Sequence, residues 1–239
     1  VPERIAEVTG DDMISLNDIL KNGTDWVFHS VSPFVFVVPV YAWRIPRKIE
    51  EILKTGIFEG SRKIYIVATM GSHAGQAGKY CQKLIIRSGM EYMGFAGICM
   101  PDNYLVSFPM MGKEEAIDRI RESIPRIYHV AERICYQKNL QETDKKKAGD
   151  LFLSGAVNQA FNYFMTGNTH FTISDDCIQC GICVRKCPVN NIVLNDGKIS
   201  FRKNCMFCLG CIHHCPVHAI DYKGKVKKIG YYTCPPDKD

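Results

Sequence analysis

A cysteine motif that occurs twice constrains this chain more than any other feature of its sequence. The pattern C-x₂-C-x₂-C-x₃-C-P runs from Cys177 to Pro188 and again from Cys205 to Pro216. Each cysteine of the first copy has a counterpart 28 residues later, and the match continues to Ile192 and Ile220. Such regular self-similarity indicates the internal duplication of one small structural unit.

The spacing of this motif suits a cubane iron–sulfur cluster, which needs four thiolates around it. Two-residue gaps let one short loop supply three thiolates, and in this kind of motif the fourth comes from the Cys-Pro of the other copy. The proline donates no backbone N–H, so the chain turns away from the cluster. We therefore predict two 4Fe–4S clusters with crossed ligands, one held by Cys177, Cys180, Cys183 and Cys215 and the other by Cys205, Cys208, Cys211 and Cys187.

Structural zinc and disulfide bonds are the alternatives for these eight cysteines. Zinc usually takes four ligands from paired knuckles, and the run of cysteines has no such break. Disulfides suit short secreted domains, and a chain of 239 residues is not one. His213 and His214 lie between two of the cysteines, and we expect them on the surface of the loop and not as zinc ligands. The segment resembles a bacterial-type two-cluster ferredoxin.

Composition excludes several other classes. A hydrophobic content of 46% and a charged content of 23% are typical of globular proteins. The longest apolar run, Phe34 to Trp43, is too short to span a membrane, and no signal peptide is visible, so a cytoplasmic location is expected. The formal net charge of +5 counts cysteines as neutral, and cluster thiolates would offset most of it. The charge is therefore no evidence for nucleic-acid binding.

Strand and helix patterns alternate through the first part of the chain. Buried strands of a parallel sheet are predicted over Pro33–Val40 and Lys63–Ala68, and a third strand is predicted over Tyr92–Met100. Helices are predicted over Pro2–Val8, Pro46–Thr55, Ala74–Ile85 and Glu114–Gln137. This alternation predicts an α/β doubly wound domain. Asp12–Leu16 is predicted as a weak strand, Asn17–Asn22 as a turn or short helix, and Cys81, Cys99 and Cys135 as core side chains.

The composition changes near residue 138. Lys138–Asp150 is rich in charge and is predicted to be a solvated linker, and Leu151–Met165 reads as a helix. We therefore predict an α/β domain over 1–148, a linker helix over 149–168 and a two-cluster domain over 169–239. Within the last, Asn195-Asp196-Gly197 predicts a tight β-hairpin.

Two loops of the predicted α/β domain could bind a ligand, because ligands of open α/β sheets lie beyond the carboxyl ends of the strands. The first loop offers the flat rings of Tyr41 and Trp43, which suit stacking on a flat ligand. The second offers Thr69, Gly71 and Ser72, whose small size lets backbone N–H groups approach a ligand. Ordinary packing is the alternative role for the two aromatic rings.

The chain resembles the EFR-type flavodoxin–ferredoxin fusion proteins of anaerobes. Three features carry the resemblance: Val38–Pro46, Thr69–Gly75 and the double cysteine motif. The resemblance implies a flavodoxin-like parallel sheet followed by a small α+β two-cluster ferredoxin domain. It also implies that Tyr41–Arg44 and Thr69–Gly75 flank the isoalloxazine ring of FMN, with Trp43 stacked on it.

The start of the chain departs from this family pattern. A flavodoxin-like domain begins with a central strand and a loop that leads to the helix N-terminus holding the FMN phosphate. Here Pro2–Val8 reads as that helix, with no strand before it and no initiator methionine. We therefore expect a truncated sequence that lacks the first strand and retains little or no flavin as given.

Three functions remain open at this point. The first is electron transfer through two clusters coupled to FMN, since flavins accept electron pairs and clusters accept single electrons. The second is a ferredoxin-type carrier whose α/β domain only docks partners. The third is a flavin oxidoreductase with a small-molecule substrate. The sequence contains no Ser-His-Asp, H-E-x-x-H or G-x-G-x-x-G constellation that would indicate hydrolytic or nicotinamide chemistry.

Basic residues near the cysteines predict an acidic redox partner protein, because opposite charges steer association. Two lie within the first copy of the motif and four follow the second: Arg185, Lys186, Lys223, Lys225, Lys227 and Lys228. The alternative is that they only balance the charge of the thiolates.

Overall fold

The computed structural model of the chain describes residues 1–23, 25–104, 106, 109–141, 147–167, 170–232 and 234. The chain forms two compact units. The first, here called the sheet unit, consists of Val1–Ser15, Thr24–Pro101 and Asp118–Gln159. The second, here called the cysteine unit, consists of Leu16–Gly23, Asp102–Ile117 and Ala160–Asp239. Among the described residues, no helix is both long and apolar enough to cross a membrane.

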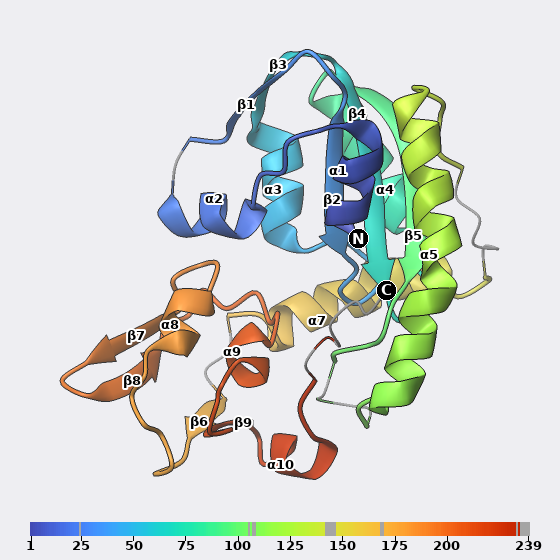
Figure 1. The fold of residues 1–239 in the computed structure, drawn as a ribbon. Coiled ribbons are helices and arrows are strands. Elements are labelled where there is room, and N and C mark those ends of the chain that lie inside the picture. Colours follow the sequence, from blue (N-terminus) through green and yellow to red (C-terminus); the bar gives the residue numbers. More distant parts are fainter. Residues whose placement is uncertain are drawn as a thin grey trace. The chain divides into compact units, whose positions relative to one another are not determined.

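The sheet unit is a mixed α/β structure with two parallel sheets (Figure 1). Its three-stranded sheet has the order β2–β4–β5, with β2 at Phe34–Pro39, β4 at Lys63–Met70 and β5 at Glu91–Cys99. A two-stranded sheet pairs β1, Val27–Ser30, with β3, Ile57–Gly60. The helices are α1 at Pro2–Thr9, α3 at Arg47–Thr55, α4 at Ala77–Arg87 and α5 at Lys113–Cys135, whose first turn is assigned to the cysteine unit.

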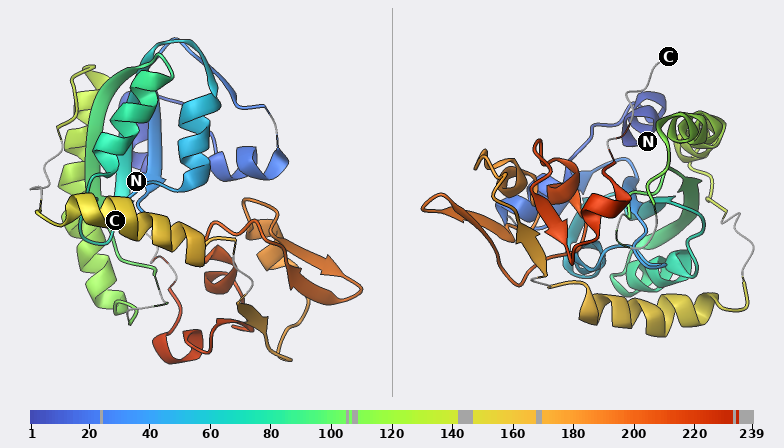
Figure 2. Two further views of the ribbon diagram at one scale, coloured as in Figure 1. Left: turned by 180° about the vertical axis from the view of Figure 1, so that it is seen from behind. Right: turned by 90° about the horizontal axis from the view of Figure 1, so that it is seen from below.

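Strand β4 is the centre of this unit and has apolar contacts on both faces. Its alternate residues Tyr65 and Val67 share a core cluster with Ile5 of α1 and with Ile127 and Ala131 of α5. Helices α3 and α4 cover the opposite face of the sheet, as the two views of Figure 2 show. A strand buried on both sides belongs at the middle of a parallel sheet, and the continuous apolar run of β4 reflects that position.

The three long strands and four long helices predicted from sequence are confirmed within a few residues. The strand predicted at Asp12–Leu16 is wrong, because Asp11–Ser15 forms no regular element and Leu16–Asn22 is the helix α2. Met13 and Ile14 are exposed, so no buried face favours a strand there. Strands β1 and β3 were not predicted, since each has at most one buried residue. A flavodoxin-like topology stays a prediction.

The cysteine predictions outside the motif are confirmed in part. Cys81 is buried, Cys99 is half-buried and Cys135 is exposed. The prediction is therefore wrong for Cys135, which is the last residue of α5 and lies beyond the buried Ile134. Residues 142–146 of the predicted solvated linker lie outside the described residues, as do the side chains of Lys227 and Lys228.

One helical segment carries the boundary between the two units. It comprises α6 at Asp150–Phe152, the π-helical turn η1 at Leu153–Val157 and α7 at Asn158–Phe164. The division falls after Gln159, inside the linker helix that the sequence predicts at 149–168. The assignment of Leu16–Gly23 to the cysteine unit was not predicted from sequence.

The cysteine unit is built from short elements. Its strands are β6 at Phe171–Ile173, β7 at Ile192–Asn195, β8 at Lys198–Phe201 and β9 at Ile220–Tyr222. Its helices beyond α7 are α8 at Ile182–Lys186, α9 at Gly210–His213 and α10 at Val226–Ile229. The predicted hairpin is confirmed: β7 pairs with β8, and Asp196 and Gly197 between them have φ values of 48° and 74°.

Strand pairing interleaves the two copies of the repeat. By the 28-residue offset, β6 of the first copy corresponds to β8 of the second, and β7 corresponds to β9. The antiparallel pairs are β6 with β9 and β7 with β8, so each pair takes one strand from each copy. Neither copy of the repeat therefore forms a sheet from its own strands alone. The core of this unit likewise combines both copies, because Phe171, Phe207 and Tyr222 pack with cysteines of both motifs.

Candidate metal centres

The two cysteine loops have the same backbone shape. Three positions in each copy adopt left-handed conformations with positive φ, a region that most residues avoid. These positions correspond pairwise between the copies: Gln179 and Phe207, Gly181 and Leu209, and Asn190 and His218. Shared conformations at matching positions mean that the sequence repeat is also a structural repeat.

Four cysteines line each of two cavities in this unit. The first cavity is lined by Cys177, Cys180, Cys183 and Cys215. The second is lined by Cys187, Cys205, Cys208 and Cys211. These are the two crossed sets expected from the repeat, and the exchange of strands explains why the last cysteine of each copy reaches the cavity of the other.

Backbone N–H groups point at the sulfur atoms. Asn191 N lies 3.1 Å from Cys187 Sγ, and the equivalent Ala219 N lies 3.3 Å from Cys215 Sγ. Phe207 N also donates to Cys205 Sγ, over 3.3 Å. Hydrogen bonds to sulfur favour the charged thiolate over the thiol.

Burial opposes the effect of these hydrogen bonds, because it favours the neutral thiol over the thiolate. It raises the pKa of the Cys205 thiol to about 12, and the neighbouring cysteines add to the effect. Burial is also the main reason that the pKa values of Cys183, Cys208 and Cys211 are raised. Thiolates crowded into a buried cavity are costly unless a cation accompanies them. The donor set therefore fits a group that brings positive charge and binds four thiolates, as iron in a cluster does.

Among the residues that the structure describes, no three or more His, Cys, Asp or Glu side chains are grouped as one metal ion would need. The cysteines of each set surround a space instead.

Residues 158–220 match a family model described as a 4Fe-4S dicluster domain. The cysteine unit therefore contains a ferredoxin-type iron–sulfur domain, and iron–sulfur electron transfer is the function that such a domain indicates. The match covers less than half of the chain and includes all eight motif cysteines. No curated protein matches the chain.

Both histidines between the motif cysteines, His213 and His214, lie within hydrogen-bonding distance of backbone atoms. His213 Nδ1 accepts a hydrogen bond from Tyr232 N at 3.1 Å, so Nε2 carries the proton and donates to Asn103 O at 2.9 Å. His213 is half-buried, which corrects its expected surface position, and burial lowers its pKa. His214 is exposed, and its Nδ1 lies 2.8 Å from Gly210 O.

In the sheet unit, the two predicted ligand loops lie next to each other. Val40 N donates to Thr69 O at 2.8 Å, which continues the pairing of β2 with β4 to the carboxyl ends of both strands. Beyond Val40, Tyr41 and Arg44 close a turn through two backbone hydrogen bonds of 2.7 and 3.2 Å. Ala42 and Trp43 at its tip have positive φ values of 47° and 62°. Tyr41 and Trp43 are both half-buried, and the ring of Trp43 lies near His73 of the second loop.

The residues of the second loop differ in exposure. Thr69 and Gly71 are half-buried, and Arg119 donates to Gly71 O at 3.2 Å. Ser72 is exposed, with its Oγ 3.3 Å from Nδ1 of His73. The ring of Trp43 lies 6.2 Å from that of His73, at a tilt of 56°. Trp43 is thus the aromatic side chain that links the two loops.

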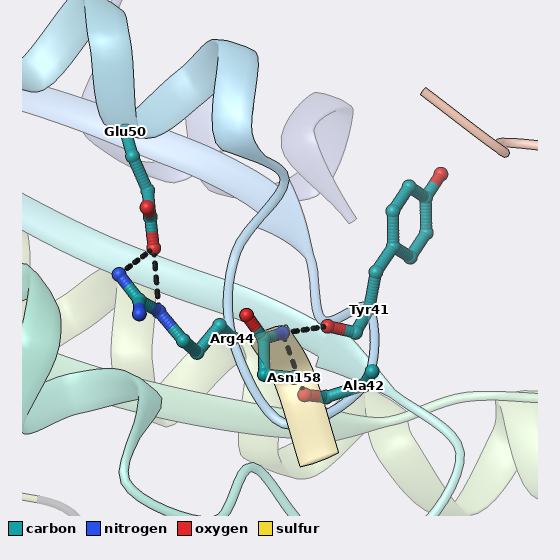
Figure 3. Close-up of polar contacts among 5 residues, drawn as sticks. All are labelled: Tyr41, Ala42, Arg44, Glu50 and Asn158. Carbon is teal, nitrogen blue, oxygen red and sulfur yellow. Dashed lines mark hydrogen bonds and ion pairs between the residues drawn. The ribbon is translucent and has the colours of Figure 1, made fainter. Parts of the chain in front are cut away.

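Arg44 supports the turn from behind. Its guanidinium lies 2.6 Å from Glu50 Oε1 (Figure 3). It also lies 3.9 Å from the centre of the Tyr80 ring. Burial nevertheless raises the pKa of Glu50, because the cost of burying the carboxylate exceeds the attraction of Arg44. The pair fixes the geometry of the turn more than it adds stability.

A row of buried polar side chains on the helical segment contacts both loops. Asn158 Nδ2 donates to Tyr41 O at 3.2 Å and to Ala42 O at 2.8 Å (Figure 3). Ser154 Oγ accepts from Gln76 N at 2.8 Å, and Asp150 Oδ1 lies 3.5 Å from His73 Nε2. The three residues are at most 4% exposed.

These three residues were not predicted from sequence, although polar residues four positions apart in an apolar helical stretch are a detectable signal. Their close packing also explains Gly75, which has a φ of 59°. A Cβ at that position would lie 2.6 Å from Ser154 Oγ and 2.9 Å from Trp43 Cβ. The second loop can pass between the helix and Trp43 only because Gly75 has no side chain.

Proposed function

We propose that this chain transfers single electrons through two 4Fe–4S clusters bound by crossed sets of cysteines. The observation that carries the proposal is the division of the eight cysteines between two cavities, four to each, with one cysteine exchanged between copies. A 4Fe–4S cluster, when bound, accepts and releases one electron at a time at a potential set by its surroundings.

The protein's own part is to hold the thiolates and control their surroundings. Apolar side chains line both cavities, among them Ile173 and Ile199 in the first and Phe171 and Leu209 in the second. They exclude water, which strengthens the N–H contacts to sulfur. Cys180 is the exposed member of the first set. An electron would therefore enter or leave the first cluster at the side that Cys180 occupies.

Metal and sulfide analysis tests the stoichiometry. Protein reconstituted without oxygen should contain about eight iron and eight sulfide per chain, as two cubane clusters require. A stable content near half of these values, or zinc in place of iron, would contradict the proposal.

The variants Cys187→Ala and Cys215→Ala test whether each cluster takes one cysteine from the other copy of the motif. Electron paramagnetic resonance of each reduced variant should show loss of the cluster in the cavity that the altered cysteine lines, which is the cavity of the other copy. If each variant loses the cluster of its own copy, the interleaved assignment fails.

FMN is the second cofactor that we propose, bound between the Tyr41–Arg44 turn and the Thr69–Gly75 loop. The proximity of these loops at the carboxyl ends of β2 and β4, where α/β sheets bind ligands, supports this site. Trp43, Tyr41, Thr69, Gly71 and Ser72 would contact the flavin. The cofactor would exchange electron pairs with a donor, while the clusters take single electrons.

A flavin titration separates the alternatives. The titration uses a chain that carries a flavodoxin-type first strand and phosphate loop ahead of Val1, because these elements hold the FMN phosphate in flavodoxin-like domains. In this chain Trp43→Leu should weaken FMN binding, while the matched control Trp26→Phe, at the other tryptophan, should not. If the extended chain binds no FMN, the sheet unit is better explained as a docking module of a ferredoxin-type carrier. Turnover that depends on a small molecule would instead support a flavin oxidoreductase.

The redox partner that we propose is an acidic protein. Arg185, Lys186, Lys223 and Lys225 are exposed around the cysteine loops, where they can attract it. The rate of electron transfer should then fall steeply as ionic strength rises. A rate independent of salt would mean that these charges only balance the thiolates.

A further inference from the structure

A lysine from the N-terminal part of the chain contacts the first cysteine loop. Helix α2 belongs to the cysteine unit, and Lys21 near its end donates through Nζ to three backbone carbonyls. The contacts are Val184 O at 2.9 Å, Arg185 O at 2.7 Å and Cys187 O at 3.4 Å. In return, Asn190 Nδ2 donates to Lys21 O at 2.6 Å. The two segments therefore hold each other on both sides of Cys187.

The contact has a clear electrostatic basis. The last carbonyls of a helix lack partners within it and carry partial negative charge, so a lysine there satisfies them and is itself stabilised. Val184 and Arg185 are in the last turn of α8. Cys187 follows that helix and lines the second cavity. The ammonium group is thus bonded to the backbone of a cavity cysteine.

The two copies of the repeat differ at this point. The carbonyls of Ile212, His213 and Cys215 correspond to those bound by Lys21, and within the described part of the chain no lysine donates to them. The first cavity has a different cation, since Arg185 Nη1 donates to Cys180 O at 3.0 Å. Among the described residues, the exposed side chain of Arg185 makes this one hydrogen bond, whereas that of Lys21 is half-buried and makes three. Solvent screens an exposed charge more strongly.

We propose that Lys21 is a positioning residue for the second cavity. It fixes the backbone of Cys187, and its positive charge favours the reduced, more negative state of the cluster bound there. It thereby raises the reduction potential of that cluster, and it affects the first cluster less, because Cys187 is the cysteine whose carbonyl Lys21 binds. The inference rests on the proposed function, because it concerns clusters bound by these cysteines.

The test compares variants of the full chain reconstituted without oxygen. Lys21→Gln keeps an N–H donor but removes the charge, and Lys21→Arg keeps the charge. Lys198→Gln removes the same charge from an exposed site on β8 and is the matched control. Iron per chain is measured first, and each cluster is then titrated by electron paramagnetic resonance, with signals assigned from Cys187→Ala and Cys215→Ala.

We expect Lys21→Gln to shift the potential of the second cluster to more negative values, Lys21→Arg to restore it and Lys198→Gln to change neither cluster. Loss of the second cluster alone in Lys21→Gln, restored in Lys21→Arg, would also support the positioning role. Unchanged potentials with full iron content, or equal shifts of both clusters, would overturn the inference. Wild-type protein that binds no iron would contradict the proposed function itself. That result differs from a failure of the Lys21 inference alone, in which the wild-type protein binds iron normally.

Discussion

In the sheet unit, strand β4 places five consecutive residues, Ile64 to Ala68, in the core with no exposed surface. In the cysteine unit, the strands have three or four residues, and Cys183, Cys187 and Cys215 are part of the core itself. Burial of apolar side chains is thus sufficient to explain the sheet unit. The cysteine unit fills its interior partly with thiols, and burial raises the pKa values of two motif cysteines, Cys183 and Cys205.

This difference concerns what each unit requires in order to stay folded. A parallel sheet covered by helices depends on the protein chain alone. A small domain with cysteine-lined cavities depends on what occupies them, because the free energy of metal binding becomes free energy of folding. Four changes to the protein test whether the two units differ in this way.

Removal of iron should have the largest effect. Chelation under anaerobic conditions should remove most amide protection from residues 170–232, because both cavities lose the group that offsets thiolate burial. The strands β2, β4 and β5 should keep their protection. Hydrogen exchange followed by mass spectrometry resolves the two units, and equal loss in both would show that they do not differ in this way.

A core substitution in the sheet unit should destabilise that unit and leave the cysteine unit unchanged. Ile66→Ala in β4 removes a side chain with no exposed surface and should cost about 2–5 kcal/mol of the stability of the sheet unit. Denaturant unfolding followed by tryptophan fluorescence reports on this unit, since Trp26 and Trp43 both lie in it. Iron content per chain should stay at the wild-type value, and a parallel loss of iron would mean that the cysteine unit depends on the sheet unit.

Asn158→Ala should have a smaller and more local effect. It removes two hydrogen bonds to the turn at Tyr41 and Ala42, at a cost of about 1–3 kcal/mol. Faster hydrogen exchange should be confined to the turn and the helical segment. The exposed neighbour Gln159 provides the control, and Gln159→Ala should leave exchange of the turn unchanged.

The smallest effect is expected for Gly224→Ala in the cysteine unit. Gly224 has a φ of 69°, and a Cβ there would meet no atom within 4 Å, so only the backbone conformation opposes the change. The cost should be about 1 kcal/mol. Thermal unfolding of the iron-loaded protein measures it, and a cost of several kcal/mol would show that this turn is more tightly constrained than its open surroundings indicate.

Much of the cysteine unit could be predicted from sequence because its information is local. The spacing of the motif predicts how the cysteines divide between two sites, and Asn195-Asp196-Gly197 predicts the hairpin that joins β7 to β8. The buried strands of the sheet unit were also predictable, since a run such as Ile64 to Ala68 shows its burial in the residues themselves. Strands β1 and β3 were missed because their partly exposed side chains give no such pattern.

Local sequence patterns predict the repeat, the two sets of cysteines and the main strands, because spacing and apolar runs act between near neighbours along the chain. Tertiary packing instead sets the contact of Lys21 with Val184, 163 residues away, and that of Asn158 with Tyr41, 117 residues away. A lysine or an asparagine can satisfy many different carbonyl groups. Which carbonyl it reaches depends on how helices and loops pack together, and no local pattern of residues encodes that choice.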